Sequence, residues 1–248
     1  MPPCPRTDNG SLPAAVFFDG RGEDLRAVYL THKNLQAVIT GLRQVYYFHQ
    51  GTCMYAHLDL FHSYGFVLQF LLPLVCDMSL YVAAEGDFNS ALAKSEAYLV
   101  LCTPTQVRQL AETDVRKSFP ILRTIFTADI QTNDPAIETL RAAGIQVHTC
   151  AGMNRTSSVC CINTDHFTGV DIAGKPLMQP GHESDSIGKP LPGVCLRAFH
   201  DDGITMCDAG EVGQLYIKGA AIPEVHDDHW VDTGWKGMVK DNGFVVLR

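Results

Sequence analysis

Between residues 79 and 149, short apolar segments alternate with amphipathic segments at intervals of about twenty residues. Strands are expected at Ser79–Ala83, Tyr98–Cys102, Leu122–Phe126 and Ile145–Thr149, with helices between them at Phe88–Ser95, Thr105–Glu112 and Pro135–Ala143. The strand segments are continuously apolar, which indicates that both faces of their sheet are covered. The pattern therefore predicts an α/β fold, with a mostly parallel sheet flanked by helices.

The segment ahead of this region predicts a leader, a strand and a helix. Residues 1–13 are rich in proline and polar residues, so we expect a disordered leader that lacks the apolar core of a signal peptide. Ala14–Phe18 is expected to form a short buried strand. Thr31 is a favourable N-cap for a helix. The apolar face of that helix carries Leu35, Val38, Ile39, Leu42, Val45 and Tyr46.

The character of the chain changes after Asn163, where glycine and proline become frequent. Short strands are expected at Val194–Phe199, Gln214–Ile217 and Phe244–Leu247, separated by turn signals. No helix is expected between residues 194 and 218. The sequence therefore predicts an α/β part over residues 14–180, followed by a small β-rich subdomain over residues 181–248.

Charge and cysteine usage disfavour several classes of protein. The 248 residues carry a formal net charge of -8, which argues against nucleic acid as a partner. Nine cysteines follow no regular framework, which favours reduced thiols in a cytoplasmic protein. The longest apolar run, Leu60–Cys76, is interrupted by polar residues and a proline. It is predicted to be a buried helix, so we expect no membrane span.

Several short motifs follow one another along the chain. They are Leu30-Thr-His-Lys-Asn-Leu35, Asp59-Leu-Phe-His-Ser-Tyr-Gly65, Leu122-Arg-Thr-Ile-Phe-Thr-Ala128, Cys150-Ala-Gly-Met-Asn-Arg-Thr-Ser157, Glu211-Val-Gly-Gln-Leu-Tyr-Ile-Lys-Gly219 and Asp232-Thr-Gly-Trp235. In this order and spacing they resemble the motifs of the AMP-forming acyl-activating enzymes, which include acyl-CoA and acyl-carrier-protein synthetases. The resemblance covers nearly the whole chain from Ala14 onward. It implies an acid–thiol ligase activity, with ATP or AMP and Mg²⁺ as the family's ligands.

The resemblance also implies roles for individual residues. The nucleotide-binding positions would be Asp232 at the ribose, Thr127 and Ala128 at the adenine-binding turn, and Arg26 in place of the phosphate-loop lysine. His62 and Gly152 would lie at the acyl pocket. Considered without the resemblance, Asp232 also fits a turn residue, and His62 fits a partly buried histidine at a helix start. Tyr64, together with the two residues after it, is predicted to belong to the core.

The departures from the family pattern concern the groups that handle ATP. Asp19, Glu23 and Asp24 fall in the expected phosphate loop, where a carboxylate repels a like charge ~4 Å away by roughly 1 kcal/mol even in water. Arg155 stands where the family has the glutamate that holds Mg²⁺, and a guanidinium cannot ligate a cation. Trp235 replaces the last aspartate of the ribose motif. The family's N-terminal third and its C-terminal lid, which carries the adenylation lysine, have no counterpart in the sequence.

A histidine–aspartate stretch and one cysteine are further candidates for reactive sites. The stretch His226-Asp-Asp-His229 has metal-type side chains, but the neighbouring proline and glycine favour a solvated acidic loop. We therefore predict no metal site. Cys150, beside the expected adenine turn, is the one cysteine that we would test as a nucleophile, although cysteines in strands usually behave as small buried hydrophobes.

Three hypotheses about function remain. The first is a binding or scaffolding module that no longer makes acyl-adenylate and holds an acyl chain or an acyl-carrier protein. The second is one part of a split, active AMP-forming acyl ligase, and the third is a folded remnant without activity. For this chain alone we expect no productive Mg-ATP binding, while weak binding of AMP through Asp232 is compatible with the motifs. Exposed apolar helices near His62 should be covered in a homodimer or by a partner chain.

Overall fold

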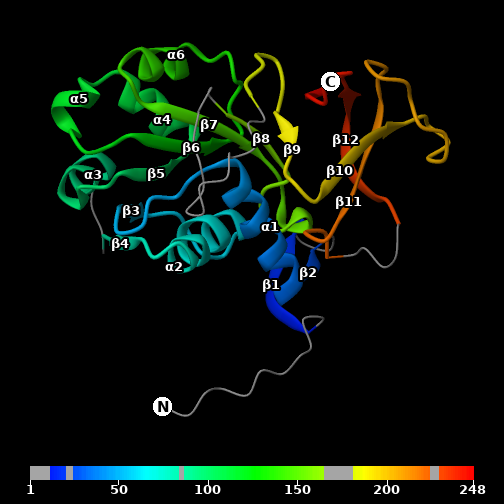
Figure 1. Cartoon of the computed structure of the whole chain (residues 1–248), viewed down its shortest axis with the longest axis horizontal. Coiled ribbons are helices and arrows are strands. Elements are labelled where there is room, and N and C mark those ends of the chain that lie inside the picture. Colours follow the sequence, from blue (N-terminus) through cyan, green and yellow to red (C-terminus); the bar gives the residue numbers. More distant parts are fainter. Residues whose placement is uncertain (1–11, 21–24, 84–86, 165–180, 224–228) are drawn as a thin grey trace.

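Residues 12–20, 25–83, 87–164, 181–223 and 229–248 are described by a computed structural model of the chain (Figure 1). Their strands form three sheets: a seven-stranded sheet, a four-stranded sheet and a two-stranded hairpin. Residues 1–11 of the predicted leader and Glu23 and Asp24 of the predicted phosphate loop lie outside the described residues. Most of the cluster between residues 226 and 229 does so as well.

The seven-stranded sheet is mostly parallel, as the spacing of its segments predicts. Its strand order is β4 (Ser79–Val82), β3 (Cys53–Ala56), β5 (Leu99–Cys102), β6 (Thr124–Ala128), β7 (Gln146–Ala151), β8 (Cys161–Asn163) and β9 (Lys189–Pro190). The first five strands pair in parallel, and β8 and β9 add antiparallel pairs at one edge. The predicted fold class is therefore confirmed.

Helices cover both faces of this sheet because alternate strand residues supply two apolar cores. On β5, Leu99 and Leu101 belong to one core, whereas Val100 and Cys102 belong to the other. The first core includes residues of α1 (His32–Val45), the π-helix η2 (Gly65–Leu71) and α2 (Leu72–Val75). The second includes residues of α3 (Phe88–Ser95), α4 (Pro104–Ala111), α5 (Val115–Ser118) and α6 (Pro135–Ala142).

Local capping fixes where α1 begins. Thr31 and Asn34 form a reciprocal capping box, in which the Thr31 hydroxyl accepts from the Asn34 N–H and the Asn34 side chain accepts from the Thr31 N–H. The predicted N-cap is thus the observed one. The apolar run from Leu60 to Cys76 contains η2 and α2, but its first residues are exposed rather than buried, with Phe61 90% exposed. Within the described residues, no helix combines the length and the apolar character needed to cross a bilayer.

The first strand differs from its prediction as a buried strand. β1 (Pro13–Asp19) pairs with β2 (Arg26–Thr31) in an antiparallel hairpin, with Asp19 opposite Arg26. Only Phe17 of β1 is buried, and Phe18 is 59% exposed. The reason is that the two-stranded hairpin packs one face against the body of the protein and leaves the other in solvent.

The four-stranded sheet is antiparallel and follows the chain order. It consists of β10 (Val194–Phe199), β11 (Gly213–Gly219), β12 (Val231–Val239) and β13 (Val245–Leu247). Residues 194–218 are all described and contain no helix, as predicted. In Figure 1 this sheet lies beside the β8–β9 edge of the larger sheet.

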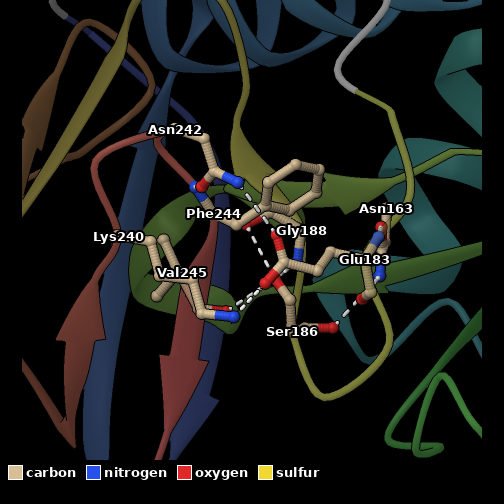
Figure 2. Close-up of polar contacts among 8 residues, drawn as sticks. All are labelled: Asn163, Glu183, Ser186, Gly188, Lys240, Asn242, Phe244 and Val245. Atoms are coloured by element: carbon tan, nitrogen blue, oxygen red, sulfur yellow. Dashed lines mark hydrogen bonds and ion pairs between the residues drawn. The ribbon is translucent and has the colours of Figure 1, made fainter. Parts of the chain in front are cut away.

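A polar contact, which we call the sheet joint, connects the two larger sheets (Figure 2). Its residues are Asn163, Glu183, Ser186, Gly188, Lys240, Asn242, Phe244 and Val245. The Asn163 side chain accepts from the Glu183 N–H (2.9 Å) and donates to the Glu183 carbonyl (2.8 Å). The Ser186 hydroxyl donates to the Val245 carbonyl (2.8 Å) and accepts from the Gly188 N–H (2.8 Å). These bonds link the segment after β8 to the start of β13.

Candidate functional site

Two adjoining cavities open at the carboxyl ends of the parallel strands, which is where open α/β sheets bind ligands. The first cavity, of about 290 Å³, is lined by Leu58, Asp59, His62, Tyr64, Gly65, Cys102, Thr103, Pro104, Ala128, Asp129, Cys150, Ala151, Gly152 and Ser158. The second, of about 450 Å³, shares Asp129, Cys150, Ala151 and Gly152 with the first. Strands β5, β6 and β7 each contribute a C-terminal residue to the first cavity, so the sheet topology itself builds this site.

One wall of the first cavity is the start of the helical segment that continues into η2. The His62 ring accepts at Nδ1 from the Tyr64 N–H, at 3.1 Å, and its side chain is exposed. Gly65 lies so close to the preceding turn that a Cβ atom there would be 2.2 Å from the Asp59 carbonyl oxygen. A π-helix is an uncommon element that is frequently found at functional sites.

The opposite wall is a tight turn after β7. A Cβ atom on Gly152 would be 1.8 Å from the Ser158 carbonyl oxygen, so only glycine permits this close approach. Ser157 and Ser158 both have positive φ, at 54° and 100°. Asp129, at the end of β6, has φ 58°. Left-handed backbone at non-glycine residues tends to cluster at ligand sites, which fits this concentration around the cavities.

Four buried hydroxyl groups in the cavity walls have no hydrogen-bond partner in the described part of the chain. Tyr64 and Ser158 carry two of them in the first cavity, and Thr132 and Thr149 carry two in the second. Burial holds the pKa of the Tyr64 phenol well above its usual value, and nearby Cys150, Cys102 and Asp129 raise it further. Tyr64 is therefore neutral at physiological pH, with its proton available for a hydrogen bond.

Asp19, in the expected phosphate loop, has its carboxylate held in place by a buried amide. The Asn154 amide donates to Asp19 Oδ1 at 2.6 Å and accepts from the Ser63 N–H at 3.0 Å. Asn154 is buried and lies in the short helix η3 (Asn154–Thr156). It therefore links the β1–β2 hairpin to the helical segment that carries His62 and Tyr64.

The predicted site residues divide into two groups. His62, Gly152 and Ala128 line the first cavity together. Thr127 is buried within β6, and neither it nor Arg26 or Asp232 lines either of the two cavities. The Asp232 carboxylate instead accepts from the Gln214 side chain (2.7 Å) and the Gly234 N–H (2.8 Å), which is turn-type bonding. Trp235, three residues later, lines the second cavity.

Several lining residues were not predicted as part of the site. Tyr64 packs against the first core, as predicted, and together with Gly65 it also lines the first cavity. Asp129 directly follows β6 and Ser158 lies in the turn after β7, and neither was singled out from the sequence. Burial raises the pKa of Cys150, so its thiol is neutral, which argues against a nucleophilic role.

Metal-type ligands come together elsewhere in the described chain. His200, Cys207 and Glu211, in the turn between β10 and β11, place one ligand atom each within 4.8 Å of one another. His200 Nε2 and Glu211 Oε2 are 3.8 Å apart, and both side chains are largely exposed. None of the three lines either cavity. Arg155, which lies in η3 and lines neither cavity, offers a cation no acceptor atom.

Comparison with known proteins now identifies the family. The family model described as AMP-binding enzyme matches residues 25–224, which is most of the chain. The chain belongs to the AMP-binding enzyme family. The fold, the cavities at the strand ends and the order of the motifs all agree with this membership.

The 2-succinylbenzoate–CoA ligases that this chain matches are about twice as long as the chain. It is 24% identical over 238 residues to the 2-succinylbenzoate–CoA ligase of Bacillus cereus (strain Q1), covering 94% of this chain and 48% of the relative. A long-chain-fatty-acid–CoA ligase of Mycobacterium bovis is 30% identical over 108 residues, covering 43% of this chain and 16% of that protein. The chain thus spans about half the length of the curated 2-succinylbenzoate ligases that it matches.

Solved structures of AMP-binding enzymes share the fold. Apo MatB from Rhodopseudomonas palustris superposes with a TM-score of 0.80 at 18% identity, over 96% of this chain and 48% of the other. O-succinylbenzoate coenzyme A synthetase from Bacillus subtilis, in complex with ATP and magnesium ion, gives a TM-score of 0.79 at 18% identity, over 96% and 50% of the two chains.

Proposed function

We propose that this AMP-binding family chain is a carboxylic-acid-binding module that does not form acyl-adenylate on its own. The observation that carries the proposal is the pair of unpartnered buried hydroxyls, on Tyr64 and Ser158, in a cavity at the strand ends. A buried polar group without a partner costs about 1–3 kcal/mol. A ligand that supplies hydrogen-bonding groups would remove that cost on binding.

The impaired adenylation follows from charge on the phosphate side. The carboxylate of Asp19 is held at 2.6 Å by Asn154, so it cannot easily turn away from an incoming polyanion. Arg155 cannot replace a carboxylate as a Mg²⁺ ligand. Phosphoryl chemistry needs compensation of the negative charge that develops in the transition state. The residues present therefore do not fit Mg-ATP.

The second cavity, on the expected nucleotide side, offers hydroxyl and aromatic groups beside its charged residues. The second cavity has two unpartnered hydroxyls, on Thr132 and Thr149, and an aromatic side chain, Trp235. These groups suit the base and ribose of AMP or adenosine better than a triphosphate. Weak nucleotide binding through this cavity is compatible with the proposal, although Asp232 does not line it.

The direct test combines a binding and an activity measurement on the full chain. We expect saturable binding of aromatic or short aliphatic carboxylic acids, observed as chemical-shift changes, with no acid-dependent exchange of pyrophosphate into ATP. Tyr64→Phe should weaken the binding, while Tyr29→Phe, which alters an exposed tyrosine on β2, should not. Acid-dependent pyrophosphate exchange above background would overturn the impaired-enzyme proposal, and the absence of binding by every acid would overturn the acid-binding proposal.

A second candidate is that the chain works as one part of a split ligase, in a complex. The observation that favours it is a set of exposed apolar side chains between residues 60 and 82: Leu60, Phe61, Leu74, Val75 and Val82. Phe61 is 90% and Val82 71% exposed. Exposed apolar side chains mark a protein interface where they join into one surface. A homodimer, a partner chain with the rest of the family fold or an acyl-carrier protein would cover it.

Light scattering across a concentration series, alone and with candidate partner chains, tests this candidate. A larger species that disappears with Phe61→Ser would support it, because Phe61 is exposed and its loss leaves the core intact. Ile204→Ser provides the control, since Ile204 is 82% exposed on the far β10–β11 turn. A monodisperse monomer under every condition would overturn it.

A further inference from the structure

We propose that the first cavity selects carboxylic acids whose acyl part carries an ammonium group and rejects those with a second carboxylate. The inference rests on the proposed function, because it specifies which acid the same cavity accepts. It depends on the charges that line the cavity, on the hydroxyl groups beside them and on the cavity's size.

The charged side chains of the cavity are almost all negative. Asp59 and Asp129 both line it, and no hydrogen bond or ion pair joins either carboxylate to another described side chain. Among the described lining residues there is no lysine or arginine, and His62 is the single basic side chain. One carboxylate on the ligand can lie beside His62, but a second would face aspartates without a compensating cation.

Buried hydroxyl groups distinguish the first cavity from a surface patch of acidic residues. Ser158 is 2% exposed and its hydroxyl has no partner in the described chain, although it lines the cavity. The Tyr64 hydroxyl is also buried and without a partner there. Neutral serine and tyrosine hydroxyls can accept from an ammonium group as well as donate. Tyr64 and Asp129 line the same cavity, so a hydroxyl and a carboxylate are both available there to an ammonium group.

The volume of the cavity sets the size of the acid. A closed apolar cavity of about 150 Å³ holds a benzene molecule. The first cavity, at about 290 Å³, therefore has room for one ring with two substituents. It is at the lower end of the range for pockets that hold drug-sized ligands. An amino-substituted aromatic or short aliphatic acid fits this volume.

Three acids of nearly equal shape separate the effects of charge from those of size. They are 4-(aminomethyl)benzoate, 4-ethylbenzoate and terephthalate, whose second substituent is positive, neutral and negative. Titrations of the full chain, followed by chemical-shift changes, should give the tightest binding for 4-(aminomethyl)benzoate. We expect 4-ethylbenzoate to bind about fivefold more weakly than 4-(aminomethyl)benzoate, and terephthalate to bind about fivefold more weakly again. Each step is the effect expected of one close charge contact in water-like surroundings.

Two variants identify the residues responsible. Asp129→Asn should weaken 4-(aminomethyl)benzoate about fivefold and leave 4-ethylbenzoate unchanged, which a general loss of folding could not do. Asp185→Asn is the matched control, because Asp185 lines only the second cavity. Tyr64→Phe should weaken 4-(aminomethyl)benzoate by about threefold to tenfold.

The outcomes distinguish this inference from the proposed function. Equal affinities for the three acids, or a preference for terephthalate, would overturn the charge selection while leaving an acid-binding protein. If Asp129→Asn weakens the binding of 4-ethylbenzoate as much as that of 4-(aminomethyl)benzoate, the role of Asp129 is overturned. If none of the three acids binds the unaltered chain, the acid-binding proposal itself fails.

Discussion

The sheet joint and the first cavity contain the same kinds of polar group in opposite circumstances. Ser186 in the joint and Ser158 in the cavity are 3% and 2% exposed. The Ser186 hydroxyl both donates and accepts, whereas the Ser158 hydroxyl has no partner in the described chain. Since most buried polar groups in proteins are paired, the cavity is the region where the fold leaves hydrogen-bonding capacity unused.

This difference implies that the polar groups of the joint stabilise the fold, whereas those of the cavity bind a ligand. In the joint, hydrogen bonds hold β13 against the segment that follows β8, so their loss should lower the free energy of unfolding. In the cavity, the hydroxyls contribute no bond to the fold, so their removal should affect ligand binding and leave stability unchanged. The predictions below test that separation, in order of decreasing effect.

Gly188→Ala should produce the largest change. Gly188 has φ 99°, and a Cβ atom there would be 2.1 Å from the Ile162 carbonyl carbon of β8. The combined cost of the backbone conformation and the overpacking is about 2–4 kcal/mol of unfolding free energy in urea denaturation. Gly51→Ala is the control, because Gly51 has φ 75° with no atom within 4 Å of its Cβ position. Equal effects for the two variants would contradict the close packing at the joint.

The same change at two serines should give different results. Ser186→Ala removes one donor and one acceptor that serve backbone groups, so we expect a loss of about 1–3 kcal/mol in unfolding free energy. Ser158→Ala removes a hydroxyl that has no partner in the described chain, so its effect should be near zero or slightly stabilising. Thermal unfolding of both variants measures the difference. A larger loss for Ser158→Ala would mean that its hydroxyl is bonded after all.

The ion pair of the joint should give a smaller, pH-dependent effect. Hydrogen bonding to the Lys240 ammonium, followed by that to the Asn242 side chain, lowers the pKa of the Glu183 carboxyl. A carboxyl with a lowered pKa stabilises the fold at pH values above its ordinary pKa, and that contribution disappears as the pH falls through the lowered value. Glu183→Gln should therefore lose under about 1 kcal/mol at pH 7, because both side chains are partly exposed, and nothing in strong acid. A loss that is the same at pH 7 and pH 2 would contradict this origin.

Tyr64→Phe should have the smallest effect on stability. The phenol oxygen of Tyr64 is buried without a partner in the described chain, so its deletion costs the fold no hydrogen bond. Tyr46→Phe is the informative comparison, because Tyr46 is paired at 2.7 Å with the Thr124 hydroxyl in the core. We expect Tyr46→Phe to lower the unfolding free energy by about 1 kcal/mol and Tyr64→Phe to leave it unchanged. Similar losses would mean that the Tyr64 hydroxyl is hydrogen-bonded in the fold, as the Tyr46 hydroxyl is.

Elements with strong local signals were predictable from the sequence. The predicted bounds of the helix at Phe88–Ser95 and of the strand at Val194–Phe199 are those observed. The helix has a local cause, since the Asp87 side chain accepts from the Ser90 N–H (3.0 Å) as an N-cap. β12 was not predicted, because its glycine-containing sequence has low intrinsic strand preference and becomes a strand through pairing with β11.

The candidate site was predictable only where a residue belongs to a motif. His62, Ala128 and Gly152 were chosen from motifs, and they meet because parallel strands bring their carboxyl ends to one edge. Tyr64 was assigned to the core, against which it packs. The sequence pattern does not show that such a side chain also faces a cavity. Asp59 begins the motif that contains His62, and Asp129 directly follows the motif that ends at Ala128, yet no pattern in the sequence shows that the two carboxylates line one cavity.

The two contacts of Asn154 have a consequence for how the site responds to ligands. One amide group holds the carboxylate of the hairpin, at Asp19, and the first turn of the cavity wall, at Ser63. A movement of the hairpin that pulls on this amide also alters the wall that carries Tyr64. A ligand that shifts this wall on binding would also shift the hairpin, and by reciprocity whatever fixes the hairpin would change that ligand's affinity by the same factor.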